Sequence, residues 1–189
     1  MKPSRLAAGF FLSLCLSLLA PASSADEEAW KALREGRAFL ILRHALAPGT
    51  GDPENFDLDD CSTQRNLNNR GLEQARSWKG LLARHGINEA RVYSSQWCRS
   101  MDTATEMDVG DVTEWPALNS FFAGRGDGAM QTRQTIALVN TLEPGLPAVL
   151  VSHQVNITRL TGVYPSSGEG VIVALPLSDN PTVLATVAP

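Results

Sequence analysis

Short apolar runs alternate along the chain with longer stretches in which apolar and polar residues mix. One run, residues 39–42, contains no polar residue, and a second run, residues 148–151, has the same character. Uninterrupted apolar runs of this length are typical of strands that are buried on both faces of a sheet. The pattern therefore predicts buried strands at residues 37–42 and 147–151.

The segment that begins at Asn68 has helical periodicity. Its apolar side chains recur every three or four residues, at Leu72, Ala75, Trp78, Leu81 and Leu82. Asn68 is a suitable N-cap, and the pair His85-Gly86 marks the end because glycine readily takes the left-handed conformation that closes a helix. The sequence predicts a helix between these two points.

The remaining elements continue the alternation. Helices are predicted at residues 27–35, 95–107 (with Ser95 as the cap), 130–142 and 155–161, and strands at 90–93, 109–115, 171–176 and 182–187, the last two as a hairpin. Residues 47–64 are predicted to form a loop across the mouth of a site, and residues 121–128 a mobile glycine-rich loop. Strands that alternate with helices favour an α/β fold in which helices cover both faces of a sheet.

The first residues have the pattern of a secretory signal. Lys2 and Arg5 precede an apolar stretch, residues 6–20, and small residues follow it. The stretch is too short to span a bilayer comfortably. We therefore expect a signal peptide at residues 1–25 and a periplasmic or secreted protein with no stable membrane anchor. An uncleaved anchor is the alternative.

Cleavage would start the mature chain at Ser23 or, preferably, at Asp26. The 164 residues that follow Ala25 suffice for one α/β domain with a real core, so a single domain is expected at residues 26–189. Loss of the two basic residues of the signal leaves 14 basic against 20 acidic residues. This negative balance argues against nucleic acid as a partner.

Cys61 and Cys98 would be the two cysteines of the mature chain. Export makes the compartment oxidising, so a disulfide between them is expected, with a pair of buried thiols as the alternative. The bridge would tie together the segments that carry Arg65 and Arg99.

Both buried runs are followed at once by a polar pair that ends in histidine. The first pair is Arg43-His44 and the second is Ser152-His153, which together hold two of the three histidines in the chain. Open α/β sheets place their active sites at the carboxyl ends of strands. These pairs therefore mark a candidate site.

The order of three motifs extends this picture. Leu-Arg-His at residues 42–44, Ser-Ser-x-x-x-Arg-x-x-x-Thr-Ala at 94–104 and Val-Ser-His at 151–153 together resemble the histidine phosphatase superfamily, the phosphoglycerate-mutase-like phosphatases. Residues 65–75 resemble the family's Arg-x-Leu-x-x-x-Gly-x-x-Gln-Ala segment. The resemblance covers nearly all of the mature chain and implies a three-layer α/β/α sandwich with a mostly parallel mixed sheet.

The chemistry follows from these residue types. A neutral imidazole is a nucleophile near pH 7, so His44 can attack phosphorus and form a phosphohistidine without a metal or a cofactor. Guanidinium forks suit the charge on the phosphoryl oxygens. We predict Arg43, His44, Arg99 and His153 as catalytic residues, and the resemblance implies that Arg65 lies at the phosphate pocket. The sequence contains no pair of histidines or cysteines at metal-ligand spacing.

The chain departs from the family at the general acid that protonates the leaving group. Many relatives have a carboxylate shortly after the second arginine helix, where this chain has Asn119 and Ser120. Asn119 is predicted to contact the substrate instead, and Glu106, Glu114 and Asp127 are the acidic candidates nearby. General acid catalysis is typically worth about 10²- to 10⁴-fold, so its loss matters for a poor leaving group.

Two hypotheses follow. The first is an exported, metal-independent phosphatase that hydrolyses a phosphomonoester through phosphohistidine and releases inorganic phosphate. The similarity extends to exported lipopolysaccharide core heptose phosphatases and to small phosphohistidine phosphatases, so a phosphorylated cell-envelope sugar is one candidate substrate. The second is a phosphate-binding protein of the same fold with little or no turnover.

Overall fold

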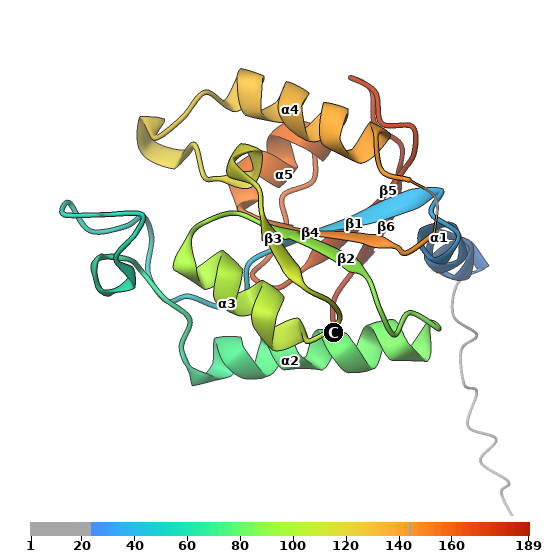
Figure 1. Cartoon of the computed structure of the whole chain (residues 1–189), viewed down its shortest axis with the longest axis horizontal. Helices are drawn as coiled ribbons and strands as arrows, with labels where there is room; N and C mark the ends of the chain where they lie inside the picture. Colours follow the sequence, from blue (N-terminus) through green and yellow to red (C-terminus); the bar gives the residue numbers. More distant parts are fainter. Residues whose placement is uncertain (1–23, 144) are drawn as a thin grey trace, which may run out of the picture.

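One six-stranded sheet forms the centre of the molecule, with strands in the order β3-β2-β4-β1-β5-β6 (Figure 1). The computed structural model describes residues 24–143 and 145–189. The strands are β1 (Ala38–Arg43), β2 (Arg91–Ser94), β3 (Val112–Glu114), β4 (Ala148–Ser152), β5 (Gly170–Ala174) and β6 (Val183–Val187). The four neighbours from β3 to β1 are parallel, whereas β5 is antiparallel to both β1 and β6. The predicted mostly parallel mixed sheet is confirmed.

Helices cover both faces of this sheet (Figure 1). They are α1 (Ser24–Arg34), α2 (Asn69–Arg84), α3 (Cys98–Met107), α4 (Gly128–Asn140) and α5 (Gln154–Thr161), with short 3₁₀ turns η1 (Cys61–Thr63), η2 (Pro116–Leu118) and η3 (Phe122–Gly124). The predicted signal peptide lies outside the described residues, except for its last two residues, which fall in α1. None of the helices that the structure describes is both long and apolar enough to cross a membrane.

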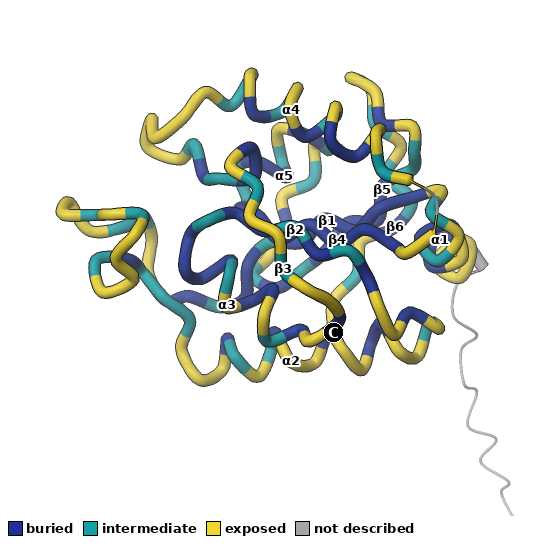
Figure 2. Tube along the Cα trace, in the orientation of Figure 1, coloured by how far each residue is buried: buried dark blue, intermediate teal, exposed yellow. Residues whose placement is uncertain are grey.

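The alternation of side chains along β1 explains the three layers. Leu40 and Leu42 pack into a core with side chains of α1, α2 and α3, whereas Phe39 and Ile41 pack into a second core with side chains of α4 and α5. Successive side chains of a strand point to opposite faces of a sheet, so a run that is apolar at every position needs a cover on both. Figure 2 shows the resulting buried strands between partly exposed helices. This arrangement confirms the predicted three-layer α/β/α sandwich.

Most helix boundaries agree with the prediction, but the start of α3 does not. The Asn68 side chain caps α2 by accepting a hydrogen bond from the Gly71 amide at 2.9 Å, and the helix ends at His85, as predicted. The prediction that Ser95 caps the next helix is wrong, because α3 begins at Cys98. The Ser95 side chain instead turns toward the carboxyl end of β4, where its hydroxyl lies 2.8 Å from a histidine nitrogen.

Helix α2 fixes the segment that leaves β1. The Leu46 amide donates a hydrogen bond to Oε1 of Gln74 at 3.0 Å, and Nε2 of Gln74 donates to the Ser167 carbonyl at 2.7 Å. Gly71 lies so close that a Cβ at this position would be 2.2 Å from the Leu46 carbonyl oxygen. A helix, the end of β1 and the turn before β5 are therefore held together just beside His44.

Candidate active site

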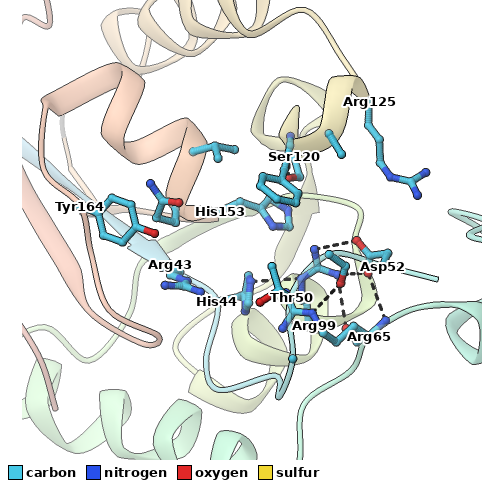
Figure 3. Close-up of a pocket in the computed structure, with 16 residues that line it drawn as sticks. Arg43, His44, Thr50, Asp52, Arg65, Arg99, Ser120, Arg125, His153 and Tyr164 are labelled. Atoms are coloured by element: carbon cyan, nitrogen blue, oxygen red, sulfur yellow. Dashed lines mark hydrogen bonds and ion pairs between the residues drawn. The ribbon is translucent and has the colours of Figure 1, made fainter. Parts of the chain in front are cut away.

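A cavity of about 240 Å³ opens at the carboxyl ends of β1 and β4, where α3 and α5 begin (Figure 3). The two strands pair in parallel with Arg43 opposite Ser152, so the residues that follow them emerge side by side. Five residues predicted from the sequence line this cavity: Arg43, His44, Arg65, Arg99 and His153. The tertiary structure thus brings together residues from four separate motifs.

His44 is buried and is positioned through both ring nitrogens. Its Nδ1 donates a hydrogen bond to the Ala45 carbonyl at 2.8 Å, which leaves Nε2 with the lone pair, and Nε of Arg99 donates to that Nε2 at 3.2 Å. Burial, followed by the nearby charge of Arg99, lowers the pKa of His44 well below its ordinary value. The imidazole is therefore neutral at neutral pH, with a nucleophilic nitrogen in the cavity wall.

His153 lies next to His44, with ring centroids 5.3 Å apart and the rings steeply inclined. Its Nε2 is 2.8 Å from Oγ of Ser95, and the same hydroxyl donates to Oδ1 of Asn119 at 3.2 Å. Burial and the neighbouring positive charges lower the pKa of His153 well below its ordinary value, so it too is neutral. Ser95 thus positions the His153 ring, and Asn119 positions the Ser95 hydroxyl.

Asn119 therefore does not occupy the position that the sequence suggested. It does not line the cavity, and its amide is taken up by Gln96: Oδ1 accepts from the backbone amide at 2.8 Å and Nδ2 donates to Oε1 at 2.9 Å. The predicted substrate contact receives no support from this placement. Its neighbour Ser120 lines the cavity instead.

Arg99 lies in the first turn of α3 and connects the nucleophile to the rest of the cavity. While its Nε bonds His44, its Nη1 and Nη2 donate to the two carboxylate oxygens of Asp52, at 2.6 and 3.2 Å. Both side chains of this ion pair are almost fully buried, at 4% and 5% exposed. These three hydrogen bonds fix the orientation of the Arg99 guanidinium between His44 and Asp52.

Asp52 is the functional candidate that sequence reasoning missed. The loop that carries it was predicted to cross the mouth of the site, but five acidic residues lie within that loop and no sequence signal distinguishes one of them. Beyond the ion pair with Arg99, the carboxylate accepts hydrogen bonds from the Arg65 amide and from Nε1 of Trp97, both at 3.2 Å. Burial raises the pKa of Asp52, but the bonds and charge of Arg99 and these further hydrogen bonds outweigh it and lower the pKa overall.

Arg65 holds the same loop in place. Its Nε donates to the Gly51 carbonyl at 2.8 Å, and Nη1 donates to the Ala47 carbonyl. Two of its donor groups therefore face the backbone rather than the cavity. Arg65 lines the cavity as predicted, but it also fixes the backbone at Ala47 and at Gly51, on either side of Gly49 and Thr50.

Arg43 has a donor that lacks a partner. Its Nη1 donates to the Pro165 carbonyl at 3.1 Å, whereas its Nε is buried without a hydrogen bond. Buried polar groups are nearly always satisfied, so this N–H is an exception among the polar groups around the cavity. Burial also lowers the pKa of Arg43, which remains far above neutral pH.

The acidic residues proposed from the sequence as proton donors lie elsewhere. Glu106 pairs with Arg76, and Glu114 accepts a hydrogen bond from Gln96. The Asp127 carboxylate caps α4 by accepting from the amides of residues 129 and 130. None of these three side chains lines the cavity.

The predicted disulfide is present. Cys61 and Cys98 are bonded, with their Cα atoms 5.7 Å apart. Because Cys98 directly precedes Arg99, the bridge ties the loop that carries Asp52 to the helix that carries Arg99. Among the described residues, no three histidine, cysteine, aspartate or glutamate side chains are grouped as a metal site would require.

The chain is similar to a known protein family. A family model described as "Histidine phosphatase superfamily (branch 1)" matches residues 39–142, a range that includes His44, Arg65 and Arg99. No curated protein sequence matches the chain.

Among solved structures, the protein histidine phosphatase SixA complexed with tungstate is 23% identical, covers 80% of this chain and 97% of its own, and has a TM-score of 0.58. A SixA-type phosphohistidine phosphatase from Agrobacterium tumefaciens is 18% identical, with coverage of 82% and 99% and a TM-score of 0.54. A mycobacterial glucosyl-3-phosphoglycerate phosphatase with inorganic phosphate is 16% identical, with coverage of 78% and 95% and a TM-score of 0.55. At these identities the likeness concerns the fold.

Proposed function

The chain belongs to the histidine phosphatase superfamily, and on this premise we propose that it is an exported, metal-independent phosphatase that hydrolyses a phosphomonoester through a phosphohistidine at His44. Phosphatase activity follows from the family. The observation that carries the proposed mechanism is the state of His44, a neutral imidazole whose Nε2 lone pair lies in a cavity lined by arginines. Such a nitrogen attacks phosphorus without prior loss of a proton, and the hydrogen bond from Arg99 to its lone pair breaks as the phosphoryl group binds.

The reaction has two steps. In the first, the Nε2–P bond forms as the P–O bond to the leaving group breaks, and the leaving oxygen takes up a proton. In the second, water attacks phosphorus, the Nε2–P bond breaks, and inorganic phosphate leaves. The phosphorylated ring carries positive charge, which the hydrogen bond from Nδ1 to the Ala45 carbonyl stabilises. Arg43 and Arg99 supply the positive charge that the phosphoryl oxygens need in the transition state.

The open cavity supports a bulky substrate. Phe122 and Tyr164 line it and expose 47% and 72% of their surface. Exposed aromatic rings offer apolar faces to a ring-shaped substrate. These two exposed rings, together with the resemblance to exported heptose phosphatases, support a phosphorylated cell-envelope sugar as the substrate.

The proposal that the protein is exported rests on two observations. Residues 1–25 have the composition of a signal peptide, and the Cys61–Cys98 disulfide belongs to an oxidising compartment. Amino-terminal sequencing of the protein from a periplasmic extract should give a mature start at Ser23 or Asp26. An intact amino terminus on membrane-bound protein would show an uncleaved anchor instead.

A second function, phosphate binding with little turnover, is favoured by one observation. Where many relatives have a carboxylate, this chain has Asn119 and Ser120, and the Asn119 side chain bonds with Gln96 and does not line the cavity. Tight binding of inorganic phosphate with no release of phosphate from any ester would support it.

The test is phosphate release from a panel of phosphomonoesters by the purified mature protein, with and without EDTA. His44→Asn should abolish release, whereas His85→Asn, which changes a histidine at the far end of α2, should leave it intact. In wild type, a rapidly quenched reaction with ³²P-labelled substrate should trap an acid-labile phosphoenzyme that the His44 variant lacks. Turnover that survives in the His44 variant, or that EDTA removes, would refute the mechanism.

A further inference from the structure

We propose that Asp52 is the proton donor to the leaving group, in place of the carboxylate that the family carries at the position of Asn119. This inference rests on the phosphohistidine mechanism proposed above. It assigns the missing acid to a residue of the loop between β1 and η1, far from Asn119 in the sequence.

Asp52 is the only acidic residue that lines the cavity, within the part of the chain that the structure describes. The other acidic candidates are engaged elsewhere, in a surface ion pair, a hydrogen bond with Gln96 and a helix cap. A general acid must be able to reach the leaving oxygen, which lies in the same cavity as His44. Among the carboxylates of residues 24–143 and 145–189, Asp52 alone meets this requirement.

The position of Asp52 relative to the nucleophile supports the same role. Arg99 bonds Nε2 of His44 through its Nε and both oxygens of Asp52 through its two terminal nitrogens. The carboxylate is therefore separated from the attacking nitrogen by the width of one guanidinium group. A phosphoryl group bound at His44 would lie against this same guanidinium.

Substrate binding itself would protonate Asp52. A phosphoryl group that approaches Nε2 competes for the N–H donors of Arg99, which removes the strongest partner of the carboxylate. It also places a second anion beside that carboxylate. Loss of an opposite charge and gain of a like charge both favour the neutral acid. The group that is ionised before binding thus becomes a proton donor after binding.

The loop allows the side chain to move while its backbone stays in place. Arg65 holds the Gly51 carbonyl, and the disulfide anchors the end of the loop at Cys61. Rotation of the Asp52 side chain, with loss of its hydrogen bonds from the Arg65 amide and Nε1 of Trp97, would carry its carboxyl group from Arg99 toward the leaving oxygen.

The proton balance closes without another reactant. A phosphomonoester monoanion brings one proton, which passes to the Asp52 carboxylate on binding. As the Nε2–P bond forms and the P–O bond breaks, Asp52 donates that proton to the leaving oxygen, and an alcohol departs. In the second step the restored carboxylate accepts a proton from the attacking water. It passes this proton to the departing phosphate, which leaves as the monoanion, and the ion pair between Asp52 and Arg99 forms again.

The test compares Asp52→Asn with wild type on two esters, p-nitrophenyl phosphate and an alkyl phosphate. The nitrophenolate leaves readily without a proton, whereas an alkoxide does not. We expect the variant to lose about 10²- to 10⁴-fold in kcat/KM on the alkyl ester and less than about 10-fold on the nitrophenyl ester. Glu54→Gln makes the same change of charge at an exposed position of the same loop and should alter neither.

A merely structural role would reduce both rates alike, and equal losses would overturn the inference. So would a rise in both rates, which would mean that Asp52 only competes with the phosphoryl group for Arg99. Partial recovery in Asp52→Glu would support proton donation. A further test uses the wild-type protein alone. Across aryl and alkyl phosphates, kcat/KM should depend only weakly on the pKa of the leaving group. A steep dependence would refute the role of Asp52 as proton donor.

Failure of this inference is separable from failure of the proposed function. If His44→Asn abolishes turnover of both esters while Asp52→Asn shows no preference between them, the phosphohistidine mechanism stands and Asp52 is not its acid. If the His44 variant stays active, the mechanism itself is wrong.

Discussion

The contact between α2 and the segment after β1 predicts an effect of substitution on stability that is opposite to the one expected from helix propensity. Gly71 lies inside α2, where alanine would ordinarily stabilise a helix by about 1 kcal/mol relative to glycine. A Cβ at this position, however, would be 2.2 Å from the Leu46 carbonyl oxygen, whereas ordinary contacts begin at 3.4 Å. The obstacle is backbone, so it cannot move aside by a side-chain rotation.

We therefore expect Gly71→Ala to destabilise the protein. Overpacking of this kind typically costs about 1 to 3 kcal/mol, and the gain in propensity offsets part of that cost. The expected net loss is up to about 2 kcal/mol, which corresponds to a fall in Tm of a few degrees for a domain of this size. Because Leu46 lies two residues after His44, kcat should fall as well.

Gly80 provides a matched control in the same helix. It is exposed, and the nearest atom to an added Cβ is the tip of the flexible Arg84 side chain at 3.6 Å. Gly80→Ala should raise the free energy of unfolding by about 0.5 to 1 kcal/mol and leave kcat unchanged. Urea unfolding of both variants, followed by far-ultraviolet circular dichroism, measures the difference. If Gly71→Ala were as stable as Gly80→Ala, the close contact inferred between α2 and Leu46 would be refuted.

Three further predictions concern stability. Replacing Cys61 and Cys98 together by serine should lower the free energy of unfolding by about 4 kcal/mol, from the loss of a cross-link across 37 positions, in urea titrations that use the oxidised wild type as reference. His44 and His153 stay neutral in the folded protein while the unfolded chain protonates them below about pH 6.5, so the unfolded state binds more protons there. Stability should therefore fall as pH drops below that value, by up to about 1.4 kcal/mol per pH unit for each histidine, and a flat stability profile in wild type would contradict their burial as neutral groups. Asn68→Ala should cost about 1 kcal/mol through loss of the α2 cap, measured by thermal unfolding, and an unchanged Tm would contradict the cap.

The layered fold was predictable because its determinants are local. The apolar run of β1 requires cover on both faces, and the caps and periodicity of α2 define a helix without reference to the rest of the chain. The start of α3 was not predictable in this way. Ser95 has the local character of a helix cap, but its hydroxyl pairs with His153, which lies 58 positions further along the chain.

The core of the site was predictable for a similar reason. His44 and His153 follow buried strands, and strand ends that are parallel neighbours meet at one edge of a sheet. The sequence could also name Arg43, Arg65 and Arg99, since each belongs to an ordered motif. It could not show what each guanidinium binds. Arg65 turns out to hold loop carbonyls, and Arg99 a carboxylate.

The amino-acid sequence by itself determined the alternation of strands and helices, the positions of the two histidines and the two cysteines available for a bridge. Only the tertiary structure decided that Asn119 does not line the cavity and that Asp52 does. The physical reason is that Asp52 belongs to a loop without periodicity, whose path is fixed by contacts with distant residues: the guanidinium of Arg65, the ion pair with Arg99 and the disulfide to Cys98. The local pattern of apolar and polar residues encodes helices and strands. The partner of a buried charge, in contrast, depends on which distant residues the fold places next to it.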